Sequence, residues 1–498
     1  MRANGIEGLF VLSEKNKLPI HESGSWNNQL LTSVLERGRQ ILVYKPNILE
    51  YFSHPSGRLL SNVDLEKSHG IYIHIKDGQQ FLDLTDHWMT GLLDRYKHPE
   101  LDDPRYHELL GILAQEKATP TETGSSIQAA FVDMMQGFFA KGIETEKENF
   151  QILPVSAGTL AVDDAIYTAR GLVAENTGQD AKKLKGLTWE GGFHGRHGEA
   201  AEVTTNKKKT GHKDKGDVTT ISPPLIVLNS DGTTNKLETN LLLEQSLKQA
   251  EEYLSKPEYA YIVVEYPIQA EGGARIINKD ALKKLQEICH KHGKVLIVDN
   301  VQMGGRSWYR NPKNGSVSPF AEEVIDYADI VAFGKVLHTN GSVINKKNIA
   351  DKGLNPEYVN QHPLEYGGTH TSTFVDMLSG MMIMSVVLEK ELWKNALQRT
   401  SNIFDALKYF ANEFDGLLSH PRGRLEDTAY LAWSFPGKET RDLFLRLMKE
   451  NEHIILLAAG DNSVRLAPNP DMNEEEMVFL ITAIENQLGV VSKIINLK

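Results

Sequence analysis

Cysteine is scarce in this sequence, because Cys289 is the only one among 498 residues. No intrachain disulfide can therefore form, and nothing indicates an oxidising compartment. Cys289 lies in LQEICHKHG, the end of an amphipathic helical pattern, which favours a buried structural thiol over a nucleophile. Long apolar runs are also lacking: none reaches about 18 residues, and the first residues contain no apolar core of signal-peptide length. We expect a cytoplasmic protein that does not span a membrane.

Positive charge is the second shortage, with 54 Lys and Arg against 66 Asp and Glu and a net charge of −12. This balance argues against a nucleic-acid surface, which needs clustered cations. The one basic run, Lys207 to Lys209 with Lys213 and Lys215, lies among Thr, Gly, His and Asp and is typical of a solvated loop. The 17 His residues show no H-E-x-x-H or comparable spacing, so no metal site is expected. No G-x-G-x-x-G fingerprint of a dinucleotide site follows a strand.

Two buried apolar runs each end in an ionisable residue. The run from Val295 to Val298 ends in Asp299, and the run from Ile330 to Phe333 ends in Gly334 and Lys335. Short, continuous, β-branched runs predict strands of a parallel sheet, whose ligands bind outside the carboxyl ends of the strands. An Asp and a Lys at this edge fit either an ion pair or pyridoxal phosphate chemistry. In that chemistry a Lys forms the Schiff base and an Asp keeps the pyridine nitrogen protonated.

Two glycine-containing turns are candidate binding elements. In the first, a strand at 150–155 runs through Ser156 and Ala157 into a helix that begins near Gly158 and Thr159. Free backbone N–H groups at such a helix start favour a phosphate, although many turns of this kind bind nothing. In the second, GGFHGR, glycines flank an aromatic ring and a cation, which predicts either a loop lining a cleft or a surface turn.

The remaining patterns predict the order of the elements. We expect a hairpin at 71–84, helices between 104 and 141 interrupted near 119–126, and a buried strand at 261–264 ending at Glu265. The helix after that strand and the strand that begins near 295 complete a βαβ unit. A long helix from about 377 to 411 should lead into an α+β tail. That tail has strands in TAYLAWSFP and SVRLAPNP, a helix at 440–450 and a terminal amphipathic helix.

Taken in order, these pieces resemble the class III aminotransferases, which are pyridoxal phosphate enzymes of fold type I. The resemblance covers roughly residues 60–490, and its most specific element is LIVDNVQMGG, followed 33 residues after Gln302 by Lys335 in AFGK. It implies an α/β fold with a large domain, built on a mostly parallel sheet flanked by helices, and a smaller α+β domain. The expected segments are an N-terminal extension (1–40), the N-terminal part of the small domain (41–105), the large cofactor-binding domain (106–385) and the C-terminal small domain (386–498).

The resemblance also implies roles for individual residues. It makes Lys335 the Schiff-base lysine and proton shuttle, and Asp299 the partner of the pyridinium nitrogen, as the two catalytic residues. Gln302 would bond the ring's phenolic oxygen, and Phe193 would stack on the ring. The full implied cofactor set is Gly158, Thr159, Phe193, His194, Asp299, Gln302, Lys335 and Thr373.

Thr373 matches a threonine that reaches the phosphate of the neighbouring subunit, which implies a homodimer with shared active sites. Within the family, FHGR, QAEGG and GDNSVRLAP are most similar to the branch of 4-aminobutyrate and L-lysine 6-aminotransferases. Arg196 would then bind the carboxylate of the ω-amino acid. Glu271 would neutralise Arg465 while the amine donor binds and then swing away, so that Arg465 binds the α-carboxylate of 2-oxoglutarate. A planar guanidinium suits bidentate carboxylate binding.

The sequence departs from the family pattern at four places. Leu160 replaces the acid of the S-G-x-E-A turn, Asn300 replaces the acid after the catalytic Asp, and Tyr266 replaces the Glu before Pro267. The residues after Thr373 are 375–378, VDML, instead of G-G-N-P.

The function that we expect is transfer of the terminal amino group of an ω-amino acid to 2-oxoglutarate. Two alternatives remain open: an amino-acid racemase or epimerase on the same fold, and a catalytically inactive family member that acts as a binding module.

Overall fold

The computed structural model describes residues 63–75, 77–85, 90–93, 98–115, 124–206, 218–229, 232–363 and 371–496, together with Arg37. The expected N-terminal extension, apart from Arg37, and the basic run that begins at Lys207 lie outside the described residues.

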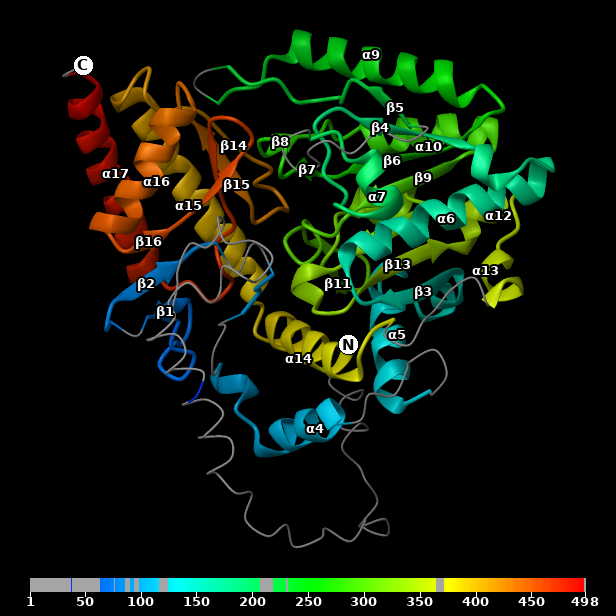
Figure 1. Ribbon diagram of the computed structural model, residues 1–498, viewed down its shortest axis with the longest axis horizontal. Coiled ribbons are helices and arrows are strands. Elements are labelled where there is room, and N and C mark those ends of the chain that lie inside the picture. The colour runs from blue at the N-terminus through cyan, green and yellow to red at the C-terminus, as the bar shows by residue number, and fades with distance from the viewer. Residues whose placement is uncertain are drawn as a thin grey trace, which may run out of the picture.

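A seven-stranded sheet with the strand order β3-β13-β12-β9-β6-β4-β5 forms the centre of the large domain (Figure 1). Neighbouring strands are parallel except for β13, which runs antiparallel to both β3 and β12, and this confirms the expected mostly parallel sheet. The strands are β3 (Phe150–Val155), β4 (Lys185–Trp189), β5 (Val218–Ile221), β6 (Tyr259–Glu265), β9 (Val295–Asp299), β12 (Ile330–Phe333) and β13 (Asn340–Asn345).

Helices cover both faces of this sheet, as β9 illustrates. Leu296 and Val298 of β9 pack into a core on one face, whereas Val295 and Ile297 pack into a core on the other face. A strand buried on both faces needs a continuous apolar sequence, which explains the runs seen in β6, β9 and β12. One face is covered by α6 (Gly158–Thr177), α7 (Gly198–Val203), α12 (Lys346–Asp351) and α13 (Tyr358–Gln361). The other is covered by α5 (Ser126–Phe139), α9 (Lys236–Leu254), α10 (Ala281–His292), α11 (Glu322–Tyr327) and α14 (Phe374–Glu389).

Shorter elements connect these layers. They are η4 (Pro99–Leu101), α4 (Pro104–Gln115), η5 (Glu144–Asn149), η6 (Ala181–Lys183), β7 (Ile268–Gln269), β8 (Arg275–Ile276), β10 (Tyr309–Arg310), β11 (Val317–Ser318) and η7 (Lys335–Leu337). Cys289 lies fully buried on α10, which confirms the expected burial, and burial raises its pKa to about 12.

The small domain combines residues from both parts of the chain. The antiparallel hairpin β1–β2 confirms the expected turn-linked pair, and β2 also pairs in parallel with β16 (Figure 1). A four-stranded sheet has the order β14-β15-β18-β17. The strands are β1 (Tyr72–His74), β2 (Gln80–Asp83), β14 (Ser419–Gly423), β15 (Leu431–Ser434), β16 (Ile454–Ile455), β17 (Leu457–Ala459) and β18 (Ser463–Leu466). The helices are α15 (Leu392–Glu413), α16 (Lys438–Asn451) and α17 (Glu474–Asn496).

The expectation of one long helix from 377 to 411 was wrong. Two helices, α14 and α15, cover this stretch, and the chain changes direction between them at Lys390 and Glu391. Glu391 has a φ of 53°, a left-handed conformation that ends a helix. The apolar pattern continues across the break, because both helices bury one side in a core.

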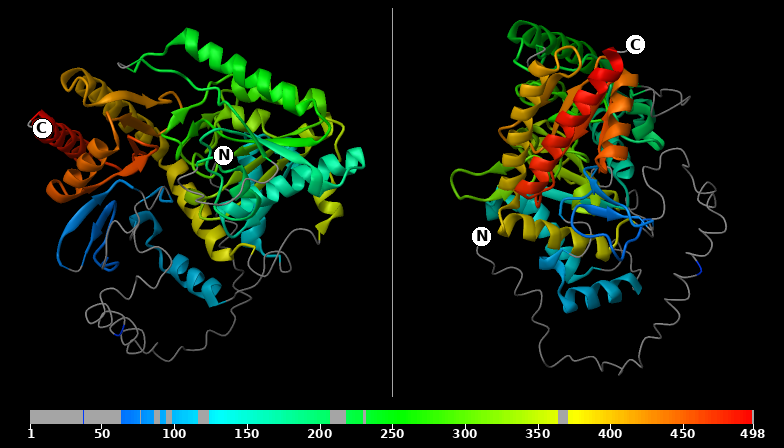
Figure 2. Two further views of the ribbon diagram at one scale, coloured as in Figure 1. Left: turned by 45° about the horizontal axis from the view of Figure 1, so that its top comes forward. Right: turned by 90° about the vertical axis from the view of Figure 1, so that its left-hand side faces the viewer.

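The terminal helix α17 packs against α15 and α16 on the small domain (Figure 2). Among the described residues it is the one helix long and apolar enough, by length and composition alone, to cross a membrane. Its buried side chains, which include Leu480, Ile484 and Leu488, belong to the small-domain core. A core helix of this kind meets the same criterion, so the match is weak support for a membrane span.

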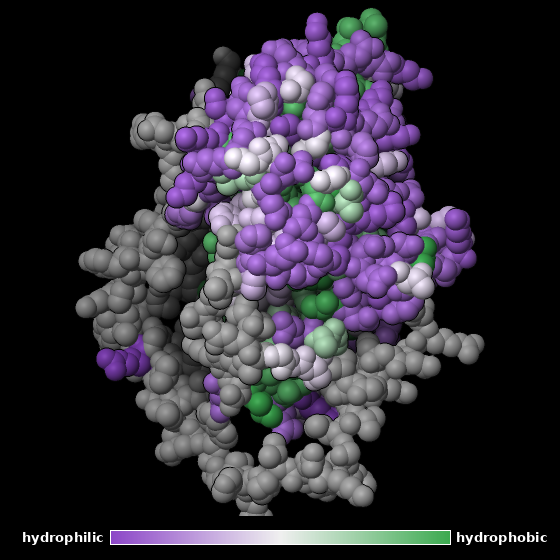
Figure 3. Space-filling view, turned by 90° about the vertical axis from the view of Figure 1, so that its right-hand side faces the viewer, coloured by the Kyte–Doolittle hydropathy of each residue, from purple (hydrophilic) through white to green (hydrophobic). Residues whose placement is uncertain are grey.

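An apolar hollow of about 640 Å³ lies between α4, α5 and α14. Ile112 of α4, Met134 of α5 and Met381 of α14 contribute to its lining, and Ile112 is 51% exposed. The described part of the face in Figure 3 is mostly hydrophilic, with small hydrophobic patches spread over it.

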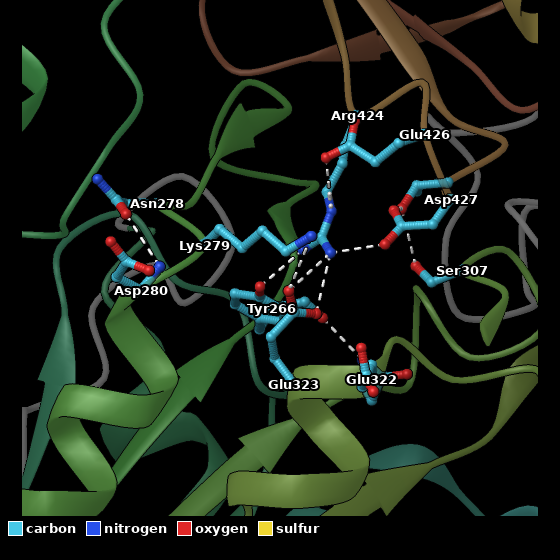
Figure 4. Close-up of polar contacts among 12 residues, drawn as sticks. Tyr266, Asn278, Lys279, Asp280, Ser307, Glu322, Glu323, Arg424, Glu426 and Asp427 are labelled. Atoms are coloured by element: carbon cyan, nitrogen blue, oxygen red, sulfur yellow. Dashed lines mark hydrogen bonds and ion pairs between the residues drawn. The ribbon is translucent and has the colours of Figure 1, made fainter. Parts of the chain in front are cut away.

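A buried ionic cluster joins the two domains (Figure 4). Arg424, just after β14, donates to the hydroxyl of Tyr266 at 2.6 Å, to Oε2 of Glu323 at 2.9 Å and to Oδ2 of Asp427 at 2.6 Å. The Lys279 ammonium lies 3.6 Å from the other oxygen of Glu323. Tyr266 and Glu323 belong to the large domain, so Arg424 fastens the small domain to it.

Candidate active site

Asp299 and Lys335 lie at the same edge of the central sheet, as the sequence predicts. Asp299 ends β9 and pairs in register with Ala332 of the parallel neighbour β12, three residues before Lys335. Lys335 has a φ of 52° at the start of η7. Burial, assisted by the positive charge of Arg465, lowers the pKa of Lys335 to about 8. About a tenth of the Lys335 amine is therefore unprotonated at pH 7, far more than for an ordinary lysine, and the unprotonated form is the nucleophile.

His194 is the side-chain partner of Asp299. Its Nδ1 atom lies 2.8 Å from Oδ2 of Asp299, and both side chains are almost fully buried. The backbone around the imidazole is held by Thr204, whose hydroxyl accepts the N–H of His194 at 2.9 Å and that of Gly195 at 3.0 Å. The sequence placed His194 in the site but did not identify this contact, which fixes the orientation of the Asp299 carboxylate.

Glu265 is a second carboxyl group at this edge. It ends β6 in register with Asp299 and is 3% exposed, and its Oε2 atom accepts the N–H of Phe193 at 3.0 Å. Burial, and then the charge of Asp299, raise the pKa of Glu265 well above its usual range. Strand-end placement identified Asp299, and the same criterion would have assigned Glu265 to the site. Together Glu265 and Asp299 hold the loop that carries Phe193 and His194.

The α6 turn meets the β9 turn and the loop after β4. A Cβ atom added to Gly158 would lie 2.8 Å from Cγ1 of Val301, and one added to Gly195 would lie 2.8 Å from Oγ1 of Thr159. Only glycine permits such close packing. The N-cap of α6 is Ala157, which makes no side-chain hydrogen bond to the helix. The first N–H groups of a 20-residue helix are therefore not capped by the Ala157 side chain, as a phosphate site requires.

Arg465 and Glu271 form a buried pair contributed by the two domains. Nη2 of Arg465, on β18, donates to Oε1 of Glu271 at 2.6 Å, and Nη1 donates to Oε1 of Gln302 at 3.3 Å. The two side chains of the ion pair are 2% and 10% exposed. The structure thus brings the predicted pair together and also links it to Gln302, which the sequence assigned to the cofactor alone.

Arg196 and Thr373 occupy more peripheral positions. Arg196 is exposed and follows His194 in the loop before α7. Thr373 is exposed at the N-cap of α14, where its hydroxyl accepts the N–H of Asp376 at 3.0 Å.

Two of the departures from the family pattern contact each other. The side-chain amide of Asn300 donates to the backbone oxygen of Tyr266 at 2.7 Å, while the Tyr266 hydroxyl accepts from Arg424. A neutral amide beside Asp299 and a buried phenol are therefore one local arrangement that connects β9 to the Arg424 cluster. Leu160 lies 43% exposed in the first turn of α6, and 375–378 form the start of α14.

Comparison with known proteins decides the family. The family model described as Aminotransferase class-III matches residues 51–488. The chain belongs to the class III aminotransferases. These enzymes use pyridoxal phosphate, and the sheet, the domain arrangement and the placement of Lys335 agree with that assignment.

Lysine aminotransferases are among the similar proteins. The L-lysine-epsilon aminotransferase of Amycolatopsis lactamdurans is 27% identical over 431 residues, which cover 83% of this chain and 89% of that protein. The ornithine aminotransferase of Saccharomyces cerevisiae is 25% identical over 432 residues, covering 83% and 90%. Among solved structures, lysine aminotransferase from M. tuberculosis in the internal aldimine form has a TM-score of 0.77 and 25% identity, covering 90% of this chain and 99% of that one.

The residues of this class III aminotransferase fit pyridoxal phosphate. The start of α6, which its N-cap side chain does not cap, lies against the loop with Gly195. The buried Asp299 carboxylate lies at the end of β9, at the same sheet edge as Lys335, whose pKa is lowered. These groups match a phosphate, a pyridine nitrogen and an aldehyde. When bound, the cofactor supplies a ring that accepts electrons from the substrate carbon.

Proposed function

We propose that this aminotransferase moves the terminal amino group of an ω-amino acid, such as lysine or 4-aminobutyrate, to 2-oxoglutarate. The observation that carries the proposal is the buried Arg465–Glu271 pair. The keto acid places an α-carboxylate at the position of Arg465, whereas the ω-amino donor places an uncharged chain there. The enzyme therefore needs a carboxylate receptor whose charge can be neutralised while the donor is bound. Glu271 neutralises Arg465 in the closed pair, and rotation of the Glu271 side chain frees the guanidinium for a bidentate bond with the α-carboxylate of the keto acid.

The same proposal assigns work to the residues around Lys335. Lys335 would bind the cofactor aldehyde with release of one water and would carry a proton to and from the substrate carbon. Asp299, oriented by His194, would hold the proton of the pyridine nitrogen, and the side-chain nitrogen of Gln302, whose oxygen accepts from Arg465, would bond the ring's phenolic oxygen. Phe193 would cover the ring face, and Glu265, which accepts the backbone N–H of Phe193 at 3.0 Å, would hold its loop in place. The first turn of α6, at Gly158 and Thr159, binds the phosphate.

Arg196 is the residue that we assign to the carboxylate of the donor. It is exposed, and it follows Phe193 and His194 in a loop whose backbone is held at both residues. A donor with its amine near Lys335 and its carboxylate at Arg196 would present a chain of limited length to the enzyme. This arrangement is the reason for expecting ω-amino acids rather than simple α-amino acids.

We also propose a homodimer in which Thr373 reaches the phosphate of the neighbouring subunit. Its exposed position at the start of α14 supports this assignment, and so does the apolar hollow beside α14, which a second copy could cover. Light scattering of the purified enzyme should give twice the chain mass of 55.7 kDa. Mixing Thr373→Ala subunits with Lys335→Ala subunits should restore activity, because one site in each mixed dimer keeps both residues. No recovery on mixing would contradict shared sites.

The amino transfer is tested with a donor panel of lysine, ornithine and 4-aminobutyrate, assayed for glutamate formed from 2-oxoglutarate. Norleucine is the matched control, because it keeps the length and α-amino acid group of lysine but lacks the terminal amine. Glutamate from at least one ω-amino donor and none from norleucine is the expected result. Activity with norleucine equal to that with lysine would contradict terminal-amine transfer.

Two variants test the receptor. Arg465→Met should raise KM for 2-oxoglutarate by about 100-fold, because a buried charge-assisted pair is lost. It should affect the use of a keto acid without a distal carboxylate, such as pyruvate, to the same extent, since both keep the α-carboxylate. Lys335→Ala should lose the cofactor absorption band near the visible edge, and an unchanged spectrum would contradict the role of Lys335.

A further inference from the structure

The turn that carries Glu271 lies between the two domains. It connects β7 to β8 in the large domain, and Gly460 of the small domain packs directly on it. The N–H of Gly460 donates to the backbone oxygen of Glu271 at 3.2 Å, and a Cβ atom on Gly460 would lie 2.8 Å from the Cα atom of Gly273. The position of Glu271 therefore depends on how the small domain holds this turn.

Arg422, on β14 of the small domain, donates two hydrogen bonds to this turn. Its Nε atom donates to the backbone oxygen of Ala274 at 3.0 Å, and Nη2 donates to the backbone oxygen of Gly273. The remaining N–H groups donate to the hydroxyls of Ser434 at 2.9 Å and Ser463 at 2.7 Å, and to the backbone oxygen of His420 at 2.9 Å. All five guanidinium N–H groups are thus used, and every acceptor is a neutral oxygen.

Burying the charged guanidinium of Arg422 among neutral acceptors costs free energy. We expect such an arrangement where the residue has a task, which here is to hold the turn. Burial lowers the pKa of Arg422 to about 10, because its acceptors are neutral and removal from water disfavours its charge. Ala274 has a φ of 54°, in the left-handed region that a residue with a Cβ adopts at a cost, so the turn is not in its most relaxed conformation. A cavity of about 350 Å³, lined in part by Gly272, Gly273 and Arg422, also leaves the turn room to move.

We propose that Arg422 is a positioning residue of the reaction, which clamps the backbone at Gly273 and Ala274 so that Glu271 meets Arg465 through motion of its side chain alone. The donors at Arg422 fix the two carbonyl groups that follow the Glu271–Gly272 step, and Gly460 fixes the carbonyl of Glu271 itself. With the backbone held at both points, rotation about the Glu271 side-chain bonds is the remaining freedom. The consequence for keto-acid binding rests on the proposed function, whereas the consequence for Lys335 does not.

Loss of the clamp should change the electrostatics at Lys335 in a defined direction. The negative charge of Glu271 raises the pKa of Lys335, and the positive charge of Arg465 lowers it. If Glu271 withdraws from Arg465, the guanidinium acts on Lys335 with less compensation, and the pH midpoint of the cofactor absorption band falls. A residue with only a structural role would lower stability without moving this midpoint.

The test uses the complete enzyme with pyridoxal phosphate bound and the variant Arg422→Met. We expect the pH midpoint of the absorption band to fall by about 0.5–1 unit. We also expect KM for 2-oxoglutarate to rise by about tenfold, with a smaller change in kcat. In the Glu271→Gln background, which lacks the charge that the clamp positions, Arg422→Met should leave the midpoint unchanged. Arg422→Lys, which keeps three donors, should give a midpoint between those of Arg422→Met and the unaltered enzyme.

Arg399→Met is the matched control, since Arg399 donates to the backbone oxygen of Met472 within the small domain and does not contact the turn. It should leave the midpoint in place. If Arg422→Met binds no cofactor, the pH midpoint of Arg422→Lys alone decides whether the proposal holds. An unchanged midpoint in the deciding variant, or an equal shift in the Glu271→Gln background, overturns the proposal. If the unaltered enzyme does not use 2-oxoglutarate, the proposed function fails, but the midpoint still tests the clamp.

Discussion

Removal of the Arg424 guanidinium should destabilise the protein mainly by leaving Glu323 buried without its partner. The Glu323 side chain is 8% exposed and receives two hydrogen bonds from Arg424, at 3.0 and 2.9 Å. Loss of one member of a buried ion pair costs about 3–5 kcal/mol. Lys279, 63% exposed and 3.6 Å from Glu323, can recover only about 0–1 kcal/mol. Arg424→Met should therefore cost about 3–4 kcal/mol.

A double-mutant cycle identifies the source of this loss. In Arg424→Met with Glu323→Gln, the abandoned carboxylate becomes a neutral amide, so at least about 1.5 kcal/mol should return relative to Arg424→Met. Urea unfolding followed by tryptophan fluorescence and circular dichroism measures each value. Glu426→Gln is the matched control, because Glu426 lies 3.5 Å from Arg424 but is 60% exposed, and it should change stability by less than about 0.5 kcal/mol. A double variant as unstable as the sum of its single variants would refute the reasoning.

Three further predictions concern the site and its support. Because burial holds the pKa of Lys335 at about 8 instead of 10.5, the cofactor-free enzyme should react with pyridoxal phosphate at a rate that rises with a midpoint near pH 8. Stopped-flow absorbance measures this, and a rate still rising at pH 10 would contradict it. Gly380→Ala should cost about 1–3 kcal/mol, because its Cβ would collide with a backbone oxygen of η7. The control is Gly489→Ala in α17, where the added Cβ meets open space and should stabilise the protein by about 0.5–1 kcal/mol. If thermal melts show the same effect for both variants, crowding by η7 is not the cause of the loss at Gly380. His194→Ala should weaken cofactor affinity about tenfold in a fluorescence titration through loss of its bond to Asp299, and unchanged affinity would count against that role.

The sequence predicted β3, β6, β9 and β12 of the central sheet but not β4, β5 and β13; β6, β9 and β12 were recognisable because they are fully buried and so continuously apolar. The same logic correctly placed Asp299 and Lys335 at one edge of that sheet. It failed at Glu391, where the apolar pattern continues although the backbone turns into the left-handed region. A hydrophobic period reports which side of a helix is buried, but it does not report where one helix ends and the next begins.

Contacts between distant residues were the part that the sequence could not supply. His194 and Asp299 are 105 positions apart, and nothing in their local sequence indicates that one orients the other. The bond between Asn300 and Tyr266 is similar, because each is an isolated departure in the sequence and only the fold joins them. Arg422 and Arg424 lie two residues apart, yet one holds a turn through neutral oxygens and the other holds an acidic cluster. Only the packing of the two domains distinguishes these roles.

The pairing of β2 with β16 has a consequence for how the enzyme is made. Residue 83 and residue 454 end up in one small sheet, so the early hairpin must wait for its partner while the intervening large domain is synthesised. Domains generally fold as units, N-terminal first, during synthesis. The sheet edge with Asp299 and Lys335 can thus form on the ribosome before Arg422 and Arg465 exist. A nascent chain halted after α14 would carry Asp299 and Lys335 without Arg465, the proposed carboxylate receptor, so the proposed keto-acid site would be the last part of the active site to form.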